Sequence, residues 1–341
     1  MGSSVYAVEA EGLVKRYVVG GLMRPKRVVE ALRGVSFRVS KGIVFSLLGP
    51  NGAGKTTTIN ILATLLEPDG GEARVLGFDV VRERWEVRKR IGVLLSVERG
   101  FFWKLTAREN LIYFGMVYGL SGKDLRERVD EVLDVVGLND LGASDKLFEE
   151  MSLGMKARLG LARALLRDPE VLLLDEPTLG LDPPSSVYVR KLLRSLAEKG
   201  KTVILTTHNM YEAEIVSDKV AMIVGGRIVI EGTPQELKKI VAKKVPVEVK
   251  LRGTIYDGGE GVRKDLVKVL GRPVYLKFSR DNDILEVRIV VEPGEEERVV
   301  EKVLRVSQSR GLRVVEAKVL EPSLEDVFIV VASSGGKDGG G

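Results

Sequence analysis

A short glycine-rich motif constrains the fold of this chain more than any other feature. It follows an apolar run at residues 43–48 and precedes a helix-compatible run at residues 56–66. Its eight residues fit the pattern G-x-x-x-x-G-K-[ST], and they are Gly49, Pro50, Asn51, Gly52, Ala53, Gly54, Lys55 and Thr56. Glycines let backbone N–H groups converge on phosphate oxygens, and the N-terminus of the following helix adds a favourable dipole. A strand, this loop and a helix, in that order, predict a phosphate-binding loop within an α/β domain.

The motif contains the side chains needed to bind a nucleoside triphosphate. Lys55 supplies a positive charge to the β- and γ-phosphates, which makes it a candidate catalytic residue, and Thr56 offers a hydroxyl to Mg²⁺. The eight residues of the motif and Thr57 are therefore candidate ATP-binding residues. A chance match in a chain with 38 glycines is the alternative. The strand and helix patterns on either side of the motif argue against it.

Two acidic residues end a second apolar run. Residues 171–174 are apolar, and Asp175 and Glu176 follow them directly. Because parallel strands release their C-terminal residues at the ligand crevice, we expect both acids to lie at the catalytic edge of the sheet. Asp175 is predicted to bind Mg²⁺ and Glu176 to act as the general base for water. A helix N-cap, the alternative role for Asp175, fits poorly because Pro177 follows so closely.

The chain has a single histidine, which lies directly after another apolar run. His208 follows residues 202–207, so its strand should end at the same edge as Asp175. A lone histidine at a strand end is usually a surface residue. Its position beside the other motifs favours a catalytic role in contact with the γ-phosphate.

Length and composition indicate two domains and exclude several classes of protein. A chain of 341 residues, of which 44% are hydrophobic, can build two cores. It has no run of 18 apolar residues and no basic-then-apolar start, so we expect neither a membrane-spanning helix nor a secretion signal, and a cytoplasmic location. The absence of cysteine excludes disulfides and thiolate metal sites.

The hydrophobic pattern changes near residue 243. Residues 1–240 alternate apolar runs with amphipathic helical patterns, which is typical of an α/β domain, and about residues 100–167 should form a helical subdomain within it. Residues 245–320 read β-α-β-β-α-β, which predicts a ferredoxin-like fold within a small α+β accessory domain at residues 245–332. The Gly-rich residues 333–341 are expected to be a disordered tail.

Residues 5–240 resemble the ATP-binding subunits of ABC transporters, which have a P-loop NTPase core with a helical insert. Where that family carries its signature motif, this chain has Met151, Ser152, Leu153, Gly154 and Met155. The resemblance implies that Ser152 and Gly154 contact the γ-phosphate of an ATP held by the opposite protomer. It also implies that Asp182 belongs to the D-loop and that Tyr17 stacks on adenine. The partners it implies are a second ATPase subunit, identical or paired, in a head-to-tail ATP sandwich, and an integral membrane permease.

The chain departs from the family pattern at two places. In the signature motif, Leu153 replaces a glycine and Met155 replaces a glutamine. After residues 91–94 the family places a glutamine that binds Mg²⁺, and this chain has none there. Ser96 or Glu98 can supply an oxygen instead, and we favour Glu98 as the third metal ligand beside Thr56 and Asp175.

Residues 321–328 resemble the end of daunorubicin-resistance-type export ATPases. That subfamily carries a C-terminal accessory domain and energises the export of drugs, lipids or polysaccharides. The resemblance therefore implies an exporter subunit that is peripheral on the inner face of the cell membrane.

Two other functions are compatible with parts of the sequence. A soluble ABC ATPase that acts on nucleic acid or on the ribosome would suit the formal charge of +5. However, the basic residues are interspersed with acidic ones, and the chain carries a single P-loop and signature, so a nucleic-acid partner is not expected. A cassette without turnover is disfavoured because Lys55, Glu176 and His208 are all present.

Three consecutive aromatic residues open the helical region. Phe101, Phe102 and Trp103 cannot all face one core, in a helix or in a strand, so at least one should be exposed. Exposed aromatic residues often anchor interfaces, and we predict that this segment contacts the membrane partner. Burial of all three by the helical region is the alternative.

Overall fold

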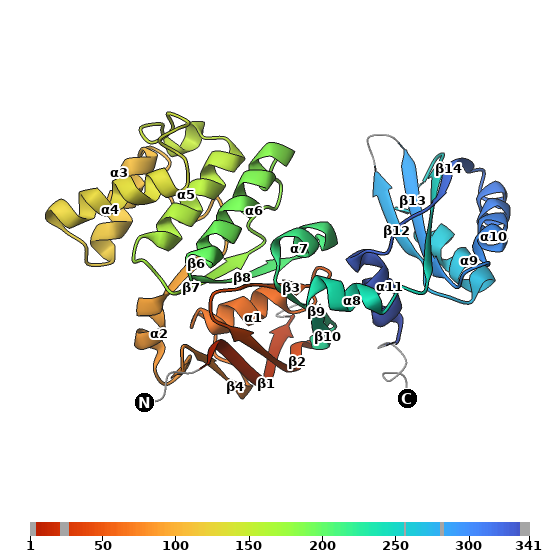
Figure 1. Cartoon of the computed structure of the whole chain (residues 1–341), viewed down its shortest axis with the longest axis horizontal. Helices are drawn as coiled ribbons and strands as arrows, with labels where there is room; N and C mark the ends of the chain where they lie inside the picture. The colour runs from red at the N-terminus through yellow and green to blue at the C-terminus, as the bar shows by residue number, and fades with distance from the viewer. Residues whose placement is uncertain (1–4, 21–26, 256, 280–282, 335–341) are drawn as a thin grey trace. The chain divides into compact units, whose positions relative to one another are not determined.

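A computed structural model of the chain describes residues 5–20, 27–255, 257–279 and 283–334. It divides into two compact units, Met1–Glu231 and Gly232–Gly341, which are described separately below (Figure 1). The division lies ahead of the short helix α8 (Pro234–Lys239), whereas the hydrophobic pattern of the sequence changes near residue 243.

A six-stranded sheet forms the centre of the first unit. Its strands, in spatial order, are β10 (Arg227–Gly232), β9 (Lys219–Val224), β3 (Val44–Leu48), β8 (Thr202–Thr207), β7 (Val171–Asp175) and β6 (Ile91–Leu94). The pairs from β9 to β6 are all parallel. Both faces of the sheet are buried, since Val203 and Leu205 belong to one hydrophobic cluster and Ile204 to another. The predicted α/β domain with a largely parallel sheet is therefore confirmed.

A second sheet and a helix cover one face of the six-stranded sheet. The second sheet is antiparallel, with the order β2 (Arg27–Ser40), β1 (Tyr6–Val19), β4 (Gly70–Val75) and β5 (Phe78–Asp79). The helix α1 (Lys55–Leu62) lies between the two sheets, and its Ile59 and Ile61 are fully buried (Figure 1). It is followed by Thr64, which has a left-handed backbone (φ 61°) and ends the helical run earlier than residue 66.

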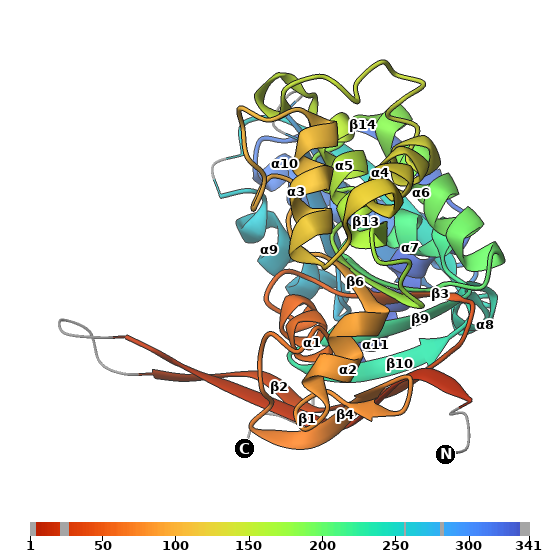
Figure 2. The ribbon, with the colours of Figure 1, turned by 90° about the vertical axis from the view of Figure 1, so that its left-hand side faces the viewer.

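The β1–β2 pair is longer than the apolar runs at residues 5–10 and 35–39 suggest. Each strand has 14 residues, and the pair extends as a ribbon beyond the rest of its sheet (Figure 2). Beyond Leu13 the ribbon side chains are largely exposed on both faces, as Val18 and Val19 are. Because neither face of this outer part is buried, apolar and polar residues need not alternate there, and the sequence does not mark it as a strand.

Helices cover the other face of the six-stranded sheet. They are α3 (Ala107–Val117), α4 (Gly122–Val135), the short 3₁₀ helix Phe148–Glu150, α5 (Leu153–Leu165), α6 (Pro183–Glu198) and α7 (Met210–Val216), while α2 (Arg84–Arg90) precedes β6. A capping box between Thr106 and Glu109 fixes the start of α3. In α4, Leu125, Val129 and Val132 are buried with Leu133, which is the apolar face that the helical spacing predicts.

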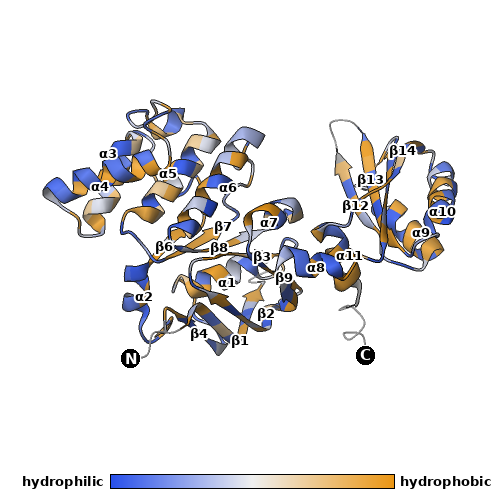
Figure 3. Ribbon diagram, viewed as in Figure 1, coloured by the Kyte–Doolittle hydropathy of each residue, from blue (hydrophilic) through white to orange (hydrophobic). Residues whose placement is uncertain are grey.

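The second unit contains one four-stranded antiparallel sheet. Its elements are β11 (Val245–Arg252), α9 (Glu260–Leu270), β12 (Tyr275–Ser279), β13 (Ile284–Val291), α10 (Glu296–Ser309), β14 (Arg313–Val319) and α11 (Leu324–Ser334). The strand order β12-β13-β11-β14 with this element order is a ferredoxin-like arrangement, as predicted. The apolar sides of α9 and α10 face the sheet and their polar sides face outward (Figure 3). The tail was predicted to begin at residue 333, but α11 continues to Ser334, so the prediction is wrong for residues 333–334. Residues 335–341 of the predicted tail lie outside the described residues.

Candidate active site

The loop between β3 and α1 has glycines where no other residue fits. A Cβ at Gly49 would lie 2.2 Å from the carbonyl oxygen of Ile223. Gly54 has a left-handed backbone (φ 108°), and a Cβ there would lie 2.6 Å from the carbonyl oxygen of Ala31. Gly52 (φ 79°) has open space in front of it, with nothing within 4 Å among the described atoms. Two glycines thus let the loop approach its neighbours closely, and the third leaves room for a phosphate.

The side chain of Lys55 lies back over this loop. Its Nζ donates hydrogen bonds to the carbonyl oxygens of Gly49 (2.7 Å) and Pro50 (3.2 Å). The same atom lies 3.3 Å from Oε1 of Glu176. The ammonium group is almost fully buried and is held by oxygen atoms alone, so a phosphate oxygen could replace any of these partners.

Thr56 and Asp175 bring two hard oxygen ligands together. Thr56 Oγ1 donates to Asp175 Oδ2 at 2.8 Å, and Thr206 Oγ1 donates to the other carboxylate oxygen, Oδ1. A hydroxyl beside a carboxylate at the mouth of the loop fits Mg²⁺, which prefers oxygen ligands and keeps several waters. Within the described ranges no group of three or more His, Asp or Glu side chains could by itself hold a metal.

Glu176 lies between the lysine and the histidine. Its backbone is left-handed (φ 48°), and its N–H donates to both the carbonyl oxygen and Oγ1 of Thr206, each at 3.1 Å. Such a conformation is uncommon for glutamate and typical of functional sites. Oε2 is 2.9 Å from Nδ1 of His208, which contacts Glu176 as expected for a residue at the same sheet edge. The structure thus brings Lys55, Asp175, Glu176 and His208 together.

A cavity of about 420 Å³ opens in front of this cluster. Its walls include Thr56, Asp175 and Glu176, and also both candidates for the missing glutamine, Ser96 and Glu98. The Glu98 carboxylate pairs with Lys156 of α5 at 3.4 Å. Both candidates therefore line the same cavity as Thr56 and Asp175, the predicted metal ligands, and the choice between them stays a prediction.

The signature and D-loop residues pack against each other at the start of two helices. Ser152 caps α5 by accepting the Met155 N–H, and Asp182 caps α6 by accepting the N–H (2.8 Å) and hydroxyl (3.0 Å) of Ser185. These two hydrogen bonds lower the pKa of Asp182. A Cβ at Gly154 would lie 2.2 Å from Ser185 Oγ, so only glycine allows this contact. In the described structure no hydrogen bond or ion pair joins Ser152, Gly154 or Asp182 to residues 49–57.

Tyr17 lies on β1 beside the first turn of α1. Its hydroxyl is 3.5 Å from Oγ1 of Thr57, and its side chain is partly exposed. An exposed aromatic ring next to the phosphate loop suits the predicted stacking on adenine, which stays a prediction.

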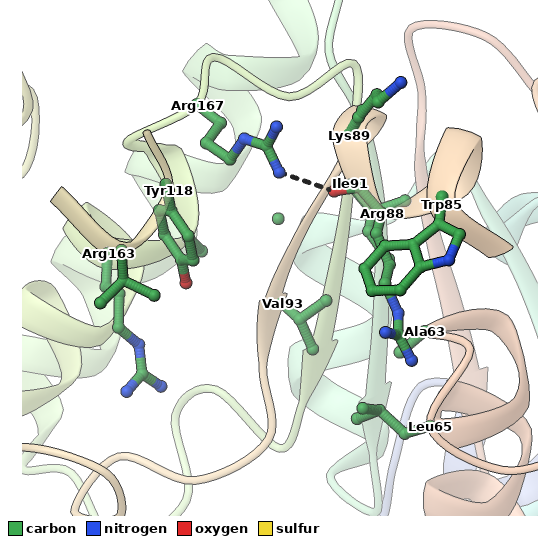
Figure 4. Close-up of a pocket in the computed structure, with 13 residues that line it drawn as sticks. Ala63, Leu65, Trp85, Arg88, Lys89, Ile91, Val93, Tyr118, Arg163 and Arg167 are labelled. Atoms are coloured by element: carbon green, nitrogen blue, oxygen red, sulfur yellow. Dashed lines mark hydrogen bonds between the residues drawn. The ribbon is translucent and has the colours of Figure 1, made fainter. Parts of the chain in front are cut away.

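A larger cavity, here called the basic groove, lies between the sheet and the helical region. It has a volume of about 620 Å³ and is lined by Ala63, Leu65, Trp85, Arg88, Lys89, Ile91, Gly92, Val93, Val117, Tyr118, Arg163, Ala164 and Arg167 (Figure 4). Four of these residues are basic and none is acidic. A second cavity, of about 560 Å³, shares Val93, Tyr118 and Arg163 with it and reaches Thr56. The basic groove is therefore continuous with the candidate active site.

Three of the basic side chains in the basic groove lack a carboxylate partner. Arg88 bonds to Thr64 Oγ1 at 2.7 Å, and Arg163 stacks 4.4 Å from the ring centre of Phe101. Arg167 donates to the carbonyl oxygen of Arg88, at 3.5 Å, and lies over the ring of Tyr118 (Figure 4). Burial lowers the pKa of Arg163. Over the described residues none of the three is in an ion pair.

The aromatic segment beside this region is divided between core and surface. Phe101 is buried and stacks on Phe148. Phe102 and Trp103 are 45% and 63% exposed, which confirms that at least one of the three faces solvent.

Three residues of the site escaped the sequence-based prediction. Thr206 bonds to both acids, Lys156 pairs with Glu98, and Ser185 packs on Gly154. Of the three, only Thr206 could have been predicted from the sequence. It lies near the end of the apolar run at residues 202–207, and the neighbouring strand ends at Asp175.

Comparisons with known proteins show the family of the chain. The family described as ABC transporter matches residues 32–179. The daunorubicin/doxorubicin resistance ATP-binding protein DrrA of Streptomyces peucetius is 38% identical over 330 residues, which cover 95% of this chain and 92% of the relative. The Nod factor export ATP-binding protein I of Rhizobium etli is 36% identical over 311 residues, covering 89% of this chain and 88% of that protein.

Solved structures give the same assignment. A dimeric structure of MJ0796, a bacterial ABC transporter cassette, superimposes with a TM-score of 0.59 at 27% identity, covering 66% of this chain and 98% of that one. None of the helices described here combines the length and apolarity needed to cross a membrane. The chain therefore belongs to the family of ABC transporter ATP-binding proteins, and it is an ATPase subunit that powers transport.

Proposed function

We propose that this subunit binds Mg²⁺-ATP at residues 49–57 and uses its hydrolysis to drive export through a membrane permease. The contact of Glu176 with both Lys55 and His208 carries this proposal, because it places a base beside a phosphate-binding lysine. Export is supported by the names of the relatives, which refer to drug resistance and Nod factor export. These functions do not favour the alternative of an ATPase acting on nucleic acid.

Each side chain of the site has a separate role in the reaction. Lys55 binds the phosphates, and Glu176 removes a proton from the attacking water. His208 holds the Glu176 carboxylate through Nδ1 and contacts the γ-phosphate. When bound, Mg²⁺ neutralises charge on the phosphates; Thr56, Asp175 and Glu98 would hold it. Tyr17 stacks on the adenine.

A second subunit completes the site. Ser152, Gly154 and Asp182 have no described bond to their own phosphate loop, and each chain has one such loop and one signature motif. Two copies, or two paired ATPase subunits, would each supply these residues to the ATP of the other in a head-to-tail dimer. Similarity to a dimeric cassette supports this arrangement.

The membrane partner contacts the basic groove and the exposed rings of Phe102 and Trp103. Unpaired guanidinium groups in a cavity favour acidic side chains, and Trp85 and Tyr118 in the wall favour apolar ones. The occupant is therefore a short cytoplasmic segment of the permease with acidic and apolar residues. This contact would keep the subunit peripheral on the inner face of the membrane.

Glu176→Gln tests the proposed reaction. The amide keeps the shape of the side chain but cannot accept the proton, so hydrolysis should fall by about 10²–10⁴-fold while ATP still binds. ATP should then hold the variant as a dimer that the wild type forms transiently. Glu198→Gln, at the exposed end of α6, removes a distant carboxylate and serves as the control. Wild-type hydrolysis in Glu176→Gln would remove this residue from the role of base.

A further inference from the structure

β14 forms an unpaired edge of the sheet in the second unit. In the part of the chain that the structure describes, it pairs only with β11, and it lies at the end of the strand order. Leu320, next after the strand, donates its N–H to Pro246 of β11. Because successive residues direct their backbone polar groups to opposite sides, Ala317 and Val319 direct theirs away from β11. Such an edge can accept another strand.

The exposed side chains of this edge are apolar on one face. Val315 and Val319 are 49% and 59% exposed, and Ala317 between them is also exposed. Glu316 and Lys318 lie on the other face, where they pair with Lys250 (2.8 Å) and Glu248 (3.1 Å) of β11. The edge carries no proline and no inward-facing charge that would prevent pairing, but the β11–β14 pair has a β-bulge at Val315, where Leu251 lies opposite Val314. The regular part of the edge is therefore residues 316–319.

The sequence of β14 is complementary to itself in one register. If two copies pair antiparallel about a two-fold axis at Ala317, Glu316 lies opposite the partner's Lys318 on each side of the axis. An axis at Glu316 or at Lys318 would instead place like charges opposite each other, which is unfavourable. The charges therefore favour the axis at Ala317 over these two, and it is the axis that brings Glu316 opposite Lys318.

The ion pairs within each sheet extend this complementarity. Across the four strands at the junction, one row would read Glu248, Lys318, the partner's Glu316 and the partner's Lys250. Positive and negative charges alternate along the whole row. The two-fold axis produces a second row of the same four residues, running in the opposite direction across the junction. No ion pair of the single subunit has to break for the second copy to bind.

We propose that two copies of this chain associate through β14, forming one continuous sheet across a two-fold axis at Ala317. This contact lies in a different unit from the ATP site and does not require nucleotide. It would hold two ATPase subunits together after hydrolysis has separated their nucleotide sites.

Disulfide trapping tests the register, and the chain has no native cysteine to interfere. Residues opposite each other in an antiparallel pair have Cα atoms roughly 4.5–5.5 Å apart, within the range of a disulfide. The full-length Ala317→Cys variant should therefore form a covalent dimer on mild oxidation without nucleotide. Val319→Cys is the matched control, because two such residues would be offset by four positions, roughly 13 Å, along the pair. Equal trapping of both variants, or none at Ala317, would overturn the proposal.

Charge reversal tests the pairing without a cross-link. Glu316→Lys and Lys318→Glu each place like charges opposite each other in a homodimer, so each should weaken nucleotide-free association by about tenfold or more in sedimentation equilibrium. The two variants mixed should form a heterodimer, because each then faces the opposite charge. Failure of the mixture to associate better than either variant alone would exclude this register. ATP-dependent dimerisation of Glu176→Gln should persist in these variants, so the two contacts can be tested separately.

Discussion

The hydroxyl of Thr206 holds both acids of the candidate active site, so its removal should weaken the site without changing its shape. Thr206 is completely buried on β8. Its Oγ1 donates to Asp175 Oδ1 and accepts the Glu176 N–H at 3.1 Å. In Thr206→Val a methyl group replaces this hydroxyl. The Glu176 N–H keeps its bond to the Thr206 carbonyl oxygen, so the proposed base should stay in place.

The expected magnitude follows from the bond that Asp175 loses. A hydrogen bond to a charged group contributes about 1.5–3 kcal/mol, and groups that orient metal ligands typically account for about 10–100-fold in metal affinity. Thr206→Val should therefore raise the Mg²⁺ concentration for half-maximal hydrolysis by about 10–100-fold. At saturating Mg²⁺ its rate should approach that of the wild type.

Thr202→Val is the matched control on the same strand. Thr202 is also buried, and its Oγ1 accepts the Gly42 N–H at 3.0 Å, far from the two acids. ATP hydrolysis would be measured against Mg²⁺ concentration for both variants, with thermal unfolding to compare their stability. An equal Mg²⁺ requirement in the two variants would refute the role given to the Thr206 hydroxyl.

Three further predictions concern the metal ligand, the partner surface and the second unit. Glu98→Ala should raise the Mg²⁺ requirement for hydrolysis, while Ser96→Ala should leave it unchanged. The reverse result would assign the ligand to Ser96. Lys156→Met is the control, because it removes the Glu98–Lys156 ion pair but keeps the Glu98 carboxylate. Trp103→Ala and Arg167→Glu should leave the ATPase activity of the isolated subunit intact. Both should weaken its co-sedimentation with vesicles that contain the permease. A loss of folding in both variants would contradict a role in partner binding. Arg288→Met should destabilise the second unit by about 3–5 kcal/mol in urea unfolding, because the fully buried Asp326 loses the two bonds that it receives from Arg288, each at 2.8 Å. Adding Asp326→Leu should recover most of that loss, and a further loss instead would show that the pair contributes little.

The sequence predicts those parts of the fold in which a buried face leaves a periodic pattern. The apolar runs of β3, β7 and β8 are visible because these strands are buried on both sides. The alternation in β11 and β13 is equally visible, since one face of each packs under α9 and α10. The outer part of the β1–β2 ribbon has no buried face, so its length could not be predicted.

Within the site, motifs identify residues but not their mutual contacts. Lys55, Asp175 and Glu176 belong to recognisable patterns, whereas the bond from Thr206 to both acids depends on the register between β7 and β8. The left-handed backbone of Glu176 is set by that register as well, through its bonds to Thr206. The pair of Glu98 with Lys156 joins a loop to a helix far along the chain, and no local pattern marks it.

The helix α5 connects the three features that the sequence left separate. Ser152 caps its N-terminus, Lys156 one turn later pairs with Glu98, and Arg163 near its other end lines the basic groove. A helix rises 1.5 Å per residue, so Ser152 and Arg163 lie about 16 Å apart on one stiff element. If Ser152 binds the γ-phosphate of the opposite subunit, as proposed, α5 should move as a body, because its backbone hydrogen bonds resist bending. The same movement shifts Arg163 and the wall of the basic groove, so closure of the ATP site is expected to reach the permease segment through this helix.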